Sequence, residues 1–161
     1  MSPITDARVL SDREFIIERS FHAPAAKVFA AYTDPNLLPR WWPPKGGSLT
    51  VETMDVRPGG EYRFVQRDAG GRTAVIVGKY VEVVPVTRLV YTFGFESQEN
   101  WITATVDLSE SEGRTSLKLT NLCESREARD MALKYGAEAG AQAAWSRLDE
   151  LLAEGQPAPG A

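Results

Sequence analysis

Four acidic residues fall inside segments of the chain that alternate like strands: Asp55, Glu61, Glu82 and Asp107. A carboxylate that points into an apolar interior has a raised pKa, because burial disfavours its charged form, and it can then act as a general base. The alternative, which we favour, is that each side chain points outward to water. Because no acid and base at a fixed spacing select a reaction, the sequence predicts no catalytic residue.

The single histidine and the single cysteine do not form a recognisable motif. No metal-ligand pattern surrounds His22, and no local signature supports a nucleophilic pair of Cys123 with His22. We interpret His22 as a surface or turn residue beside Pro24, and Cys123 as a small buried hydrophobe. The sequence therefore predicts no metal site and no cofactor.

Arginine residues gather around one expected hairpin, at Arg57, Arg63, Arg67 and Arg72. Such a group could hold an acidic ligand or an acidic partner. Exposed charges on a hairpin more commonly form a solvated face, where each ion pair contributes little. We favour the solvated face.

Aromatic residues recur at strand spacing. Tyr62 shares a face with Phe64, and Tyr91 shares one with Phe93, because side chains two apart on a strand lie on the same side. These rings could line one chamber or form an ordinary core, and alternation does not say which face is inward. The residues predicted to bind a ligand in such a chamber are Trp41, Trp42, Tyr62, Phe64, Tyr91, Phe93, Trp101, Tyr135, Ala141 and Trp145.

The elements that must position these residues are mostly strands. The pattern predicts a first strand over 13–21, a short helix from Pro24 to about Asp34, and a second short helix over 36–41. Six further strands follow, separated by short polar or glycine-bearing connections that are typical of antiparallel hairpins. Their predicted ranges are 49–56, 61–66, 73–84, 88–95, 101–108 and 115–122.

Two helices are predicted at the end of the chain. The apolar positions change phase near Gly136 and Gly140, so we expect one helix over 126–134 and a longer one over 137–154. The longer helix carries small residues in its first half and large ones from Trp145 onward. Packed against a sheet, such a helix either leaves an apolar pocket open at one end or packs closely with no usable cavity.

Composition limits the class of protein. A chain of 161 residues with 43% hydrophobic content fits a single domain, which we place at 13–154 between flexible tails at 1–12 and 155–161. A formal charge of -4 argues against nucleic acid as a partner, because phosphate binding needs a basic field. No apolar run is long enough to predict a membrane span. The lack of a signal-peptide pattern and the lone cysteine lead us to expect a cytoplasmic protein.

Several short motifs resemble a known family. Residues 19–24 (Arg-Ser-Phe-His-Ala-Pro), 33–35 (Thr-Asp-Pro), 41–44 (Trp-Trp-Pro-Pro) and 58–60 (Pro-Gly-Gly) are similar to motifs of bacterial members of the activator-of-Hsp90-ATPase homologue family. Pro43 stands where that family usually has glycine, and Ala144 stands where it often has the glycine of a Gly-Trp pair. The resemblance runs from about Arg13 to Glu154.

This resemblance implies an α+β fold of the helix-grip type, as in the START and Bet v 1 (SRPBCC) superfamily. The expected architecture is a curved seven-stranded antiparallel sheet wrapped around a long C-terminal helix, with two short helices after the first strand. It also implies a hydrophobic cavity between the sheet and that helix.

Three hypotheses of function follow from the resemblance and the residues. We rank first a binding module for a small apolar or aromatic ligand, and second an enzyme of the cyclase or dehydratase type found among relatives in the superfamily. A stress-response co-chaperone of Hsp90 ranks third, since activators of that kind carry an additional N-terminal domain that we do not expect here. A homodimer is compatible with the sequence, and the identity of the ligand cannot be predicted from it.

Overall fold

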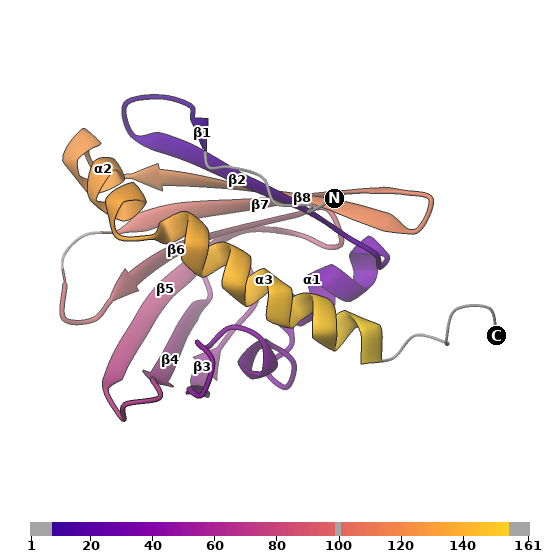
Figure 1. Cartoon of the computed structure of the whole chain (residues 1–161), viewed down its shortest axis with the longest axis horizontal. Helices are drawn as coiled ribbons and strands as arrows, with labels where there is room; N and C mark the ends of the chain where they lie inside the picture. Colours follow the sequence, from indigo (N-terminus) through magenta and orange to yellow (C-terminus); the bar gives the residue numbers. More distant parts are fainter. Residues whose placement is uncertain (1–7, 99–100, 155–161) are drawn as a thin grey trace.

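The structure, a computed structural model, describes residues 8–98 and 101–154 of the chain. It contains a single curved antiparallel sheet, and helix α3 lies across one face of it (Figure 1). The helix-grip α+β fold expected from the sequence is thereby confirmed. From one edge to the other, the strands are β1 (Arg8–Val9), β2 (Glu14–Phe21), β8 (Arg114–Cys123), β7 (Ile102–Ser111), β6 (Arg88–Phe95), β5 (Thr73–Val84), β4 (Glu61–Arg67) and β3 (Ser48–Met54).

Eight strands are present in the described part of the chain, whereas the sequence predicted seven. The additional strand, β1, consists of two residues, which pair with Ile16 and Phe15 of β2. Two residues cannot show an alternating pattern, so Arg8 and Val9 were expected in the tail at 1–12. Residues 10–12 of the predicted tail form a turn in which the Leu10 amide donates to the Glu14 backbone oxygen at 2.9 Å. Residues 1–7 and 155–161 lie outside the described residues.

Two irregularities bend the sheet. The pairing register shifts between Val51 and Thr53 in β3, and between Tyr80 and Glu82 in β5. An extra residue on one strand increases the local twist and bends that strand. The two shifts therefore help to give the sheet the concave face that α3 covers.

Four helical segments accompany the sheet: α1 (Ala25–Thr33), η1 (Leu38–Arg40), α2 (Arg126–Lys134) and α3 (Ala137–Glu154). The short helix expected over 36–41 is a single 3-10 turn, because Pro39 lacks an amide hydrogen and does not extend a regular helix. Helix α2 begins after Ser125, whose Oγ accepts a hydrogen bond from the Ala128 amide at 3.0 Å.

Gly136 separates α2 from α3. Its φ of 90° lies in the left-handed region that favours glycine. Gly140 is part of α3. Of the two glycines at the predicted change of phase, only Gly136 breaks the helix.

Arg19 of β2 ties α3 to the sheet. Its Nη1 donates to the backbone oxygen and to Oε1 of Gln142, both at 3.1 Å, and to Oγ of Ser146 at 3.2 Å. Its Nη2 donates to Asp149 at 2.5 Å. Arg19 is only 8% exposed, and a buried guanidinium needs such acceptors because its desolvation is costly. These contacts hold α3 against β2 over residues 142–149.

Candidate ligand-binding cavity

A cavity of about 730 Å³ lies between α3 and the concave face of the sheet. Its wall on the sheet side comes from inward side chains of neighbouring strands, among them Phe15 of β2, Leu119 of β8 and Ala104 of β7. Most of the wall is apolar or aromatic. The volume is within the roughly 300–1,000 Å³ that is usual for sites that bind small molecules.

Small residues on α3 leave this space open. Ala137, Gly140, Ala141 and Ala144 line the cavity, and none carries more than a methyl group. Trp145, which is 2% exposed, forms the wall beyond them. The part of this helix predicted to carry small side chains thus lies over the cavity.

Seven of the ten residues predicted to bind a ligand line this cavity: Trp41, Trp42, Tyr91, Phe93, Tyr135, Ala141 and Trp145. The ring centres of Trp41 and Trp42 are 5.6 Å apart, and those of Trp42 and Phe93 are 6.2 Å apart. The fold therefore brings together rings from the loop after η1, the sheet and α3. Their role in binding stays a prediction.

Tyr62 and Phe64, also predicted, do not line the cavity. They stack on each other with ring centres 4.6 Å apart, and both are nearly fully buried. The Tyr62 hydroxyl donates to the backbone oxygen of Thr92 at 2.6 Å. These two residues lie around a void of about 20 Å³ beside Trp42, so they are part of the packed core.

Trp101 lies on the other side of the sheet. Since Ile102 and Ala104 of β7 face the cavity, the alternation turns residues 101 and 103 outward. The indole is 37% exposed and covers Gly94, where an added Cβ would meet its ring at 2.9 Å. Spacing alone predicted that Trp101 shares a face with Thr103, but it did not say which face that is.

Much of the cavity wall was not predicted from the sequence. The lining residues that were not predicted include the apolar or aromatic Phe15, Ile17, Tyr32, Ile76, Phe95, Ile102, Ala104 and Leu119, and the polar Lys45, Gln66, Asn121 and Arg147. One available signal is the alternating row 117, 119, 121 and 123 on β8, which reads Leu, Leu, Asn, Cys. A single amide in an apolar row marks a position that faces something other than ordinary core.

Asn121 is the buried polar residue of the sheet wall. It is 8% exposed and is paired across the strands with Phe15 and Ala104, which also line the cavity. Within residues 8–98 and 101–154, no hydrogen bond is formed by its side-chain amide. Its amide faces the cavity, so a hydrogen-bonding group of a ligand could pair with it.

Two tyrosines add hydroxyl groups to the wall. Burial raises the pKa of Tyr91 well above its ordinary value, and the nearby tyrosines Tyr32, Tyr62 and Tyr80 raise it further. Burial also raises the pKa of Tyr32, although its hydrogen bond from Trp145 Nε1, at 3.0 Å, acts in the opposite direction. Both hydroxyls thus stay protonated at neutral pH and can donate a hydrogen bond, but cannot serve as bases.

The charged residues that line the cavity are both basic, Lys45 and Arg147. Arg147 Nε donates to the backbone oxygen of Trp41 at 3.0 Å. No Asp, Glu or His is among the described residues of the wall.

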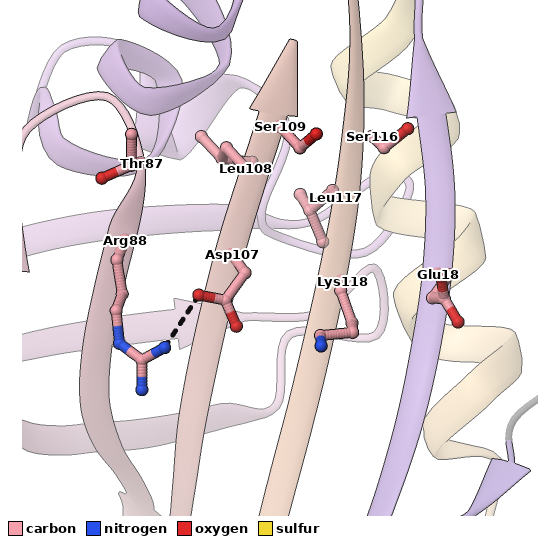
Figure 2. Close-up of a pocket in the computed structure, with 9 residues that line it drawn as sticks. All are labelled: Glu18, Thr87, Arg88, Asp107, Leu108, Ser109, Ser116, Leu117 and Lys118. Carbon is pink, nitrogen blue, oxygen red and sulfur yellow. Dashed lines mark hydrogen bonds and ion pairs between the residues drawn. The ribbon is translucent and has the colours of Figure 1, made fainter.

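The four carboxylates that the sequence placed in strands lie elsewhere, and one of them, Asp55, comes just after the end of β3 and not within a strand. Asp107 forms an ion pair with Arg88 at 2.9 Å, in a row that continues across the strands to Lys118 and Glu18 on the face turned away from α3 (Figure 2). Arg88 also pairs with Glu82, at 2.7 Å. Glu18, Arg88, Asp107 and Lys118 border a pocket on this face, so its lining includes charges of both signs.

The other two carboxylates also avoid the cavity. Asp55 pairs with Arg57 at 2.7 Å, and Glu61 is exposed. Arg63 pairs with Glu52 and Glu96, whereas Arg67 and Arg72 are exposed. The outward orientation of the carboxylates and the solvated hairpin face were both the favoured interpretations.

His22 and Cys123 are too far apart to act together. Cys123 donates its amide hydrogen to the Arg13 backbone oxygen at one end of β2, while His22 follows the other end. Nine residues of extended strand span about 30 Å. The Cys123 thiol is buried, and this burial raises its pKa. Cys123 is thus a buried thiol, as predicted, and His22 is exposed.

Neither a membrane-spanning helix nor a metal-binding cluster is found among the described residues. In 8–98 and 101–154, no helix is both long and apolar enough to cross a membrane. In the same ranges, His, Cys, Asp and Glu residues do not gather into a group that could hold a metal ion.

Comparisons with known proteins give a consistent family and fold. The family model described as "Activator of Hsp90 ATPase homolog 1-like protein" matches residues 22–153. The chain is 26% identical to protein Ms6760 from Mycobacterium smegmatis, covering 96% of this chain and 100% of the other, with a TM-score of 0.85. A protein from Rhodobacter sphaeroides gives 26% identity, coverage of 94% and 99%, and a TM-score of 0.85.

A more distant structure shares the fold alone. DynU16, from the dynemicin biosynthetic locus, is 22% identical with a TM-score of 0.68, and the match covers 91% of this chain and 49% of DynU16. The comparison with curated proteins gave no match.

Proposed function

The chain belongs to the family of Activator of Hsp90 ATPase homolog 1-like proteins, and from this premise we propose that it binds a small, mainly apolar molecule between α3 and the sheet. The observation that carries the proposal is the cavity of about 730 Å³ with its mainly apolar wall. Protein interiors are close-packed, and voids larger than a water molecule are few. This space is open to solvent at one side, and its size and mainly apolar wall suit an apolar occupant.

The arrangement of polar groups supports binding more than catalysis. An enzyme of the cyclase or dehydratase type needs a group that removes a proton, and the described wall offers no carboxylate and no imidazole. The Tyr91 and Tyr32 hydroxyls and the Asn121 amide could orient a ligand or polarise a carbonyl group. We therefore keep the enzyme as the second candidate.

The family description names an Hsp90 activator, but no feature of the described residues favours an Hsp90 contact over a bound small molecule. Binding of a purified Hsp90 would be the direct test of that third hypothesis.

The test of binding fills the cavity with a side chain. N-phenyl-1-naphthylamine, a neutral apolar dye whose fluorescence rises in apolar surroundings, serves as the probe. Ala141→Phe places a ring in the cavity and should weaken dye binding at least about tenfold, a loss of about 1.4 kcal/mol. Ala139→Phe adds the same ring on the exposed side of α3 and should leave dye affinity unchanged.

Two outcomes would contradict the proposal. The first is that the natural sequence does not bind the dye. The second is that Ala141→Phe and Ala139→Phe bind the dye equally well, since binding would then occur outside the cavity. Circular dichroism and thermal melting of each variant establish that α3 is still folded.

A further inference from the structure

The charge of the cavity wall is opposite in sign to the charge of the chain. The chain has 22 acidic and 18 basic residues, for a formal charge of -4. The charged side chains in the described wall are Lys45 and Arg147, and both are basic. A wall that is apolar apart from cations and neutral hydrogen-bonding groups favours an anion over a cation of the same shape.

Arg147 is held where it can meet a ligand. It is the only basic residue of α3, and its Nε donates to the Trp41 backbone oxygen at 3.0 Å. This bond fixes the guanidinium beside the loop that carries Trp41 and Trp42, both of which line the cavity. The bond uses Nε and leaves the two terminal nitrogens to bind an oxygen anion in a bidentate manner.

No carboxylate in the described part of the chain pairs with Arg147. The nearby acids on α3 are engaged elsewhere: Asp149 pairs with Arg19, and Glu154 pairs with Arg40, each at 2.5 Å. Glu150 forms no ion pair with Arg147 and acts on it only at longer range. Partial burial lowers the pKa of Arg147, and Glu150 opposes that effect. The guanidinium has thus lost some water without gaining a counterion, which an anionic ligand would supply.

Lys45 approaches the cavity from a different element. It lies in the loop between η1 and β3, and the Gly47 amide donates to the Pro44 backbone oxygen at 2.8 Å, which closes a turn around it. Pro44 and Lys45 both line the cavity and are exposed, so this part of the wall lies at its mouth. A long lysine side chain at this position can reach a charge held by Arg147 or leave it in water.

We infer that the ligand is an amphipathic organic acid whose apolar body fills the cavity and whose anionic group binds Arg147, with Lys45 as a second cation at the mouth. The inference rests on the proposed function, because it specifies the ligand of the same cavity. An acid at the mouth keeps part of its hydration, while the apolar body gains from burial.

The test uses three probes with the same twelve-carbon chain: dodecanoate, dodecan-1-ol and dodecylammonium. Each displaces N-phenyl-1-naphthylamine from the protein at pH 7.5 and at concentrations below micelle formation. The natural sequence should bind dodecanoate about tenfold more tightly than dodecan-1-ol, and dodecylammonium more weakly than either. The preference for dodecanoate should shrink as salt is added.

Single-residue variants identify which side chains cause the preference for dodecanoate. Arg147→Gln should weaken dodecanoate at least about fivefold and leave dodecan-1-ol unchanged, whereas Arg147→Lys should retain part of the preference. Lys45→Gln, in an exposed loop where misfolding is of less concern, should weaken dodecanoate about twofold to threefold. Arg126→Gln removes the same charge from an exposed position on α2 outside the cavity wall and should change neither affinity.

The outcomes separate the two proposals. If the dye binds but dodecanoate and dodecan-1-ol displace it equally, the preference for an acid is wrong and apolar binding stands. Equal losses for dodecanoate and dodecan-1-ol in Arg147→Gln would also overturn the inference, because Arg147 would then act only by shaping the wall. If the dye and all three probes fail to bind, both the inference and the proposed function fail.

Discussion

Asn121 interrupts an apolar row on β8, between Leu119 and Cys123. Its backbone is satisfied by pairing with β2 and β7, but its side chain faces the cavity and has no hydrogen-bond partner in the described part of the chain. A residue of this kind contributes little to the stability of the empty protein. Its side chain would contribute a hydrogen bond only when a bound ligand presents a matching polar group.

Asn121→Leu should therefore stabilise the unliganded protein. An apolar side chain in this mainly apolar wall should raise the free energy of unfolding by about 1 kcal/mol, and the cavity has room for the larger side chain. Urea unfolding measures the change. Gln98→Leu, at an exposed loop position, is the matched control and should shift stability by less than about 0.5 kcal/mol. Destabilisation by Asn121→Leu would instead mean that the amide holds the sheet together.

Individual residues were the part of the site that the sequence predicted least well. Alternation placed Tyr91 with Phe93 and Trp101 with Thr103, but one pair proved to line the cavity and the other to face outward. Which pair faces the cavity depends on which face of the sheet the helix covers. Alternation along a strand shows only which residues share a face, not which face is covered. Arg147 was missed for a similar reason, since its position at the cavity depends on a contact with the Trp41 backbone more than a hundred residues away in the sequence.

At the scale of elements, sequence patterns were much more informative. The ranges predicted for α2 and α3 match the structure, and so do those of β5 and β6. These segments have either a long amphipathic repeat or clear alternation bounded by glycine and proline. The elements whose existence or type differs are the shortest ones, β1 and η1, where two or three residues give no period to detect. The other predicted ranges differ only at their ends, by up to three residues, as in β7, which spans Ile102–Ser111 where 101–108 was predicted.

The two glycines near the start of α3 should respond in opposite ways to the same added methyl group. Gly140 lies within a regular helix, and a Cβ added there would meet no atom within 4 Å, so Gly140→Ala should raise the free energy of unfolding by about 0.5–1 kcal/mol. Gly136 has a φ of 90°, so Gly136→Ala should lower it by about 1–2 kcal/mol.

Urea unfolding of both variants tests this contrast, and each serves as the control for the other. Equal effects would mean that α2 and α3 are not joined through a left-handed residue at position 136.

At the scale of the whole molecule, four buried tyrosines share one interior: Tyr32, Tyr62, Tyr80 and Tyr91. Burial raises the pKa of each above its ordinary value of 10.0. In the unfolded chain these phenols lose their protons near pH 10, while in the folded protein they keep them. The folded state then binds more protons than the unfolded state, so stability is fully present below about pH 10 and is lost as the pH rises further.

Alkaline unfolding should consequently be steep. Each such tyrosine contributes a loss of up to about 1.4 kcal/mol per pH unit once the pH exceeds about 10. Tyr91→Phe, which removes a hydroxyl with no hydrogen-bond partner in the described residues, should flatten the decline at little cost at pH 8. Tyr62→Phe should flatten it too, but at the cost of the bond to Thr92. Urea midpoints at pH 8 to 11 measure both, and a Tyr91→Phe curve parallel to that of the natural sequence would contradict the expectation.

The bonds from Arg19 to α3 also determine when the cavity can exist during synthesis. Strands β3 to β7 pair with neighbours in the chain and can form hairpins as they leave the ribosome. Strand β2 must wait for β8, and the acceptors that Arg19 uses on α3 are available only after residues 142–149 have emerged. Contacts so distant in sequence form late, because the intervening chain must first be ordered. The cavity is therefore the last part of the protein to be completed, and a newly made chain exposes the apolar wall of its sheet until α3 arrives to cover it.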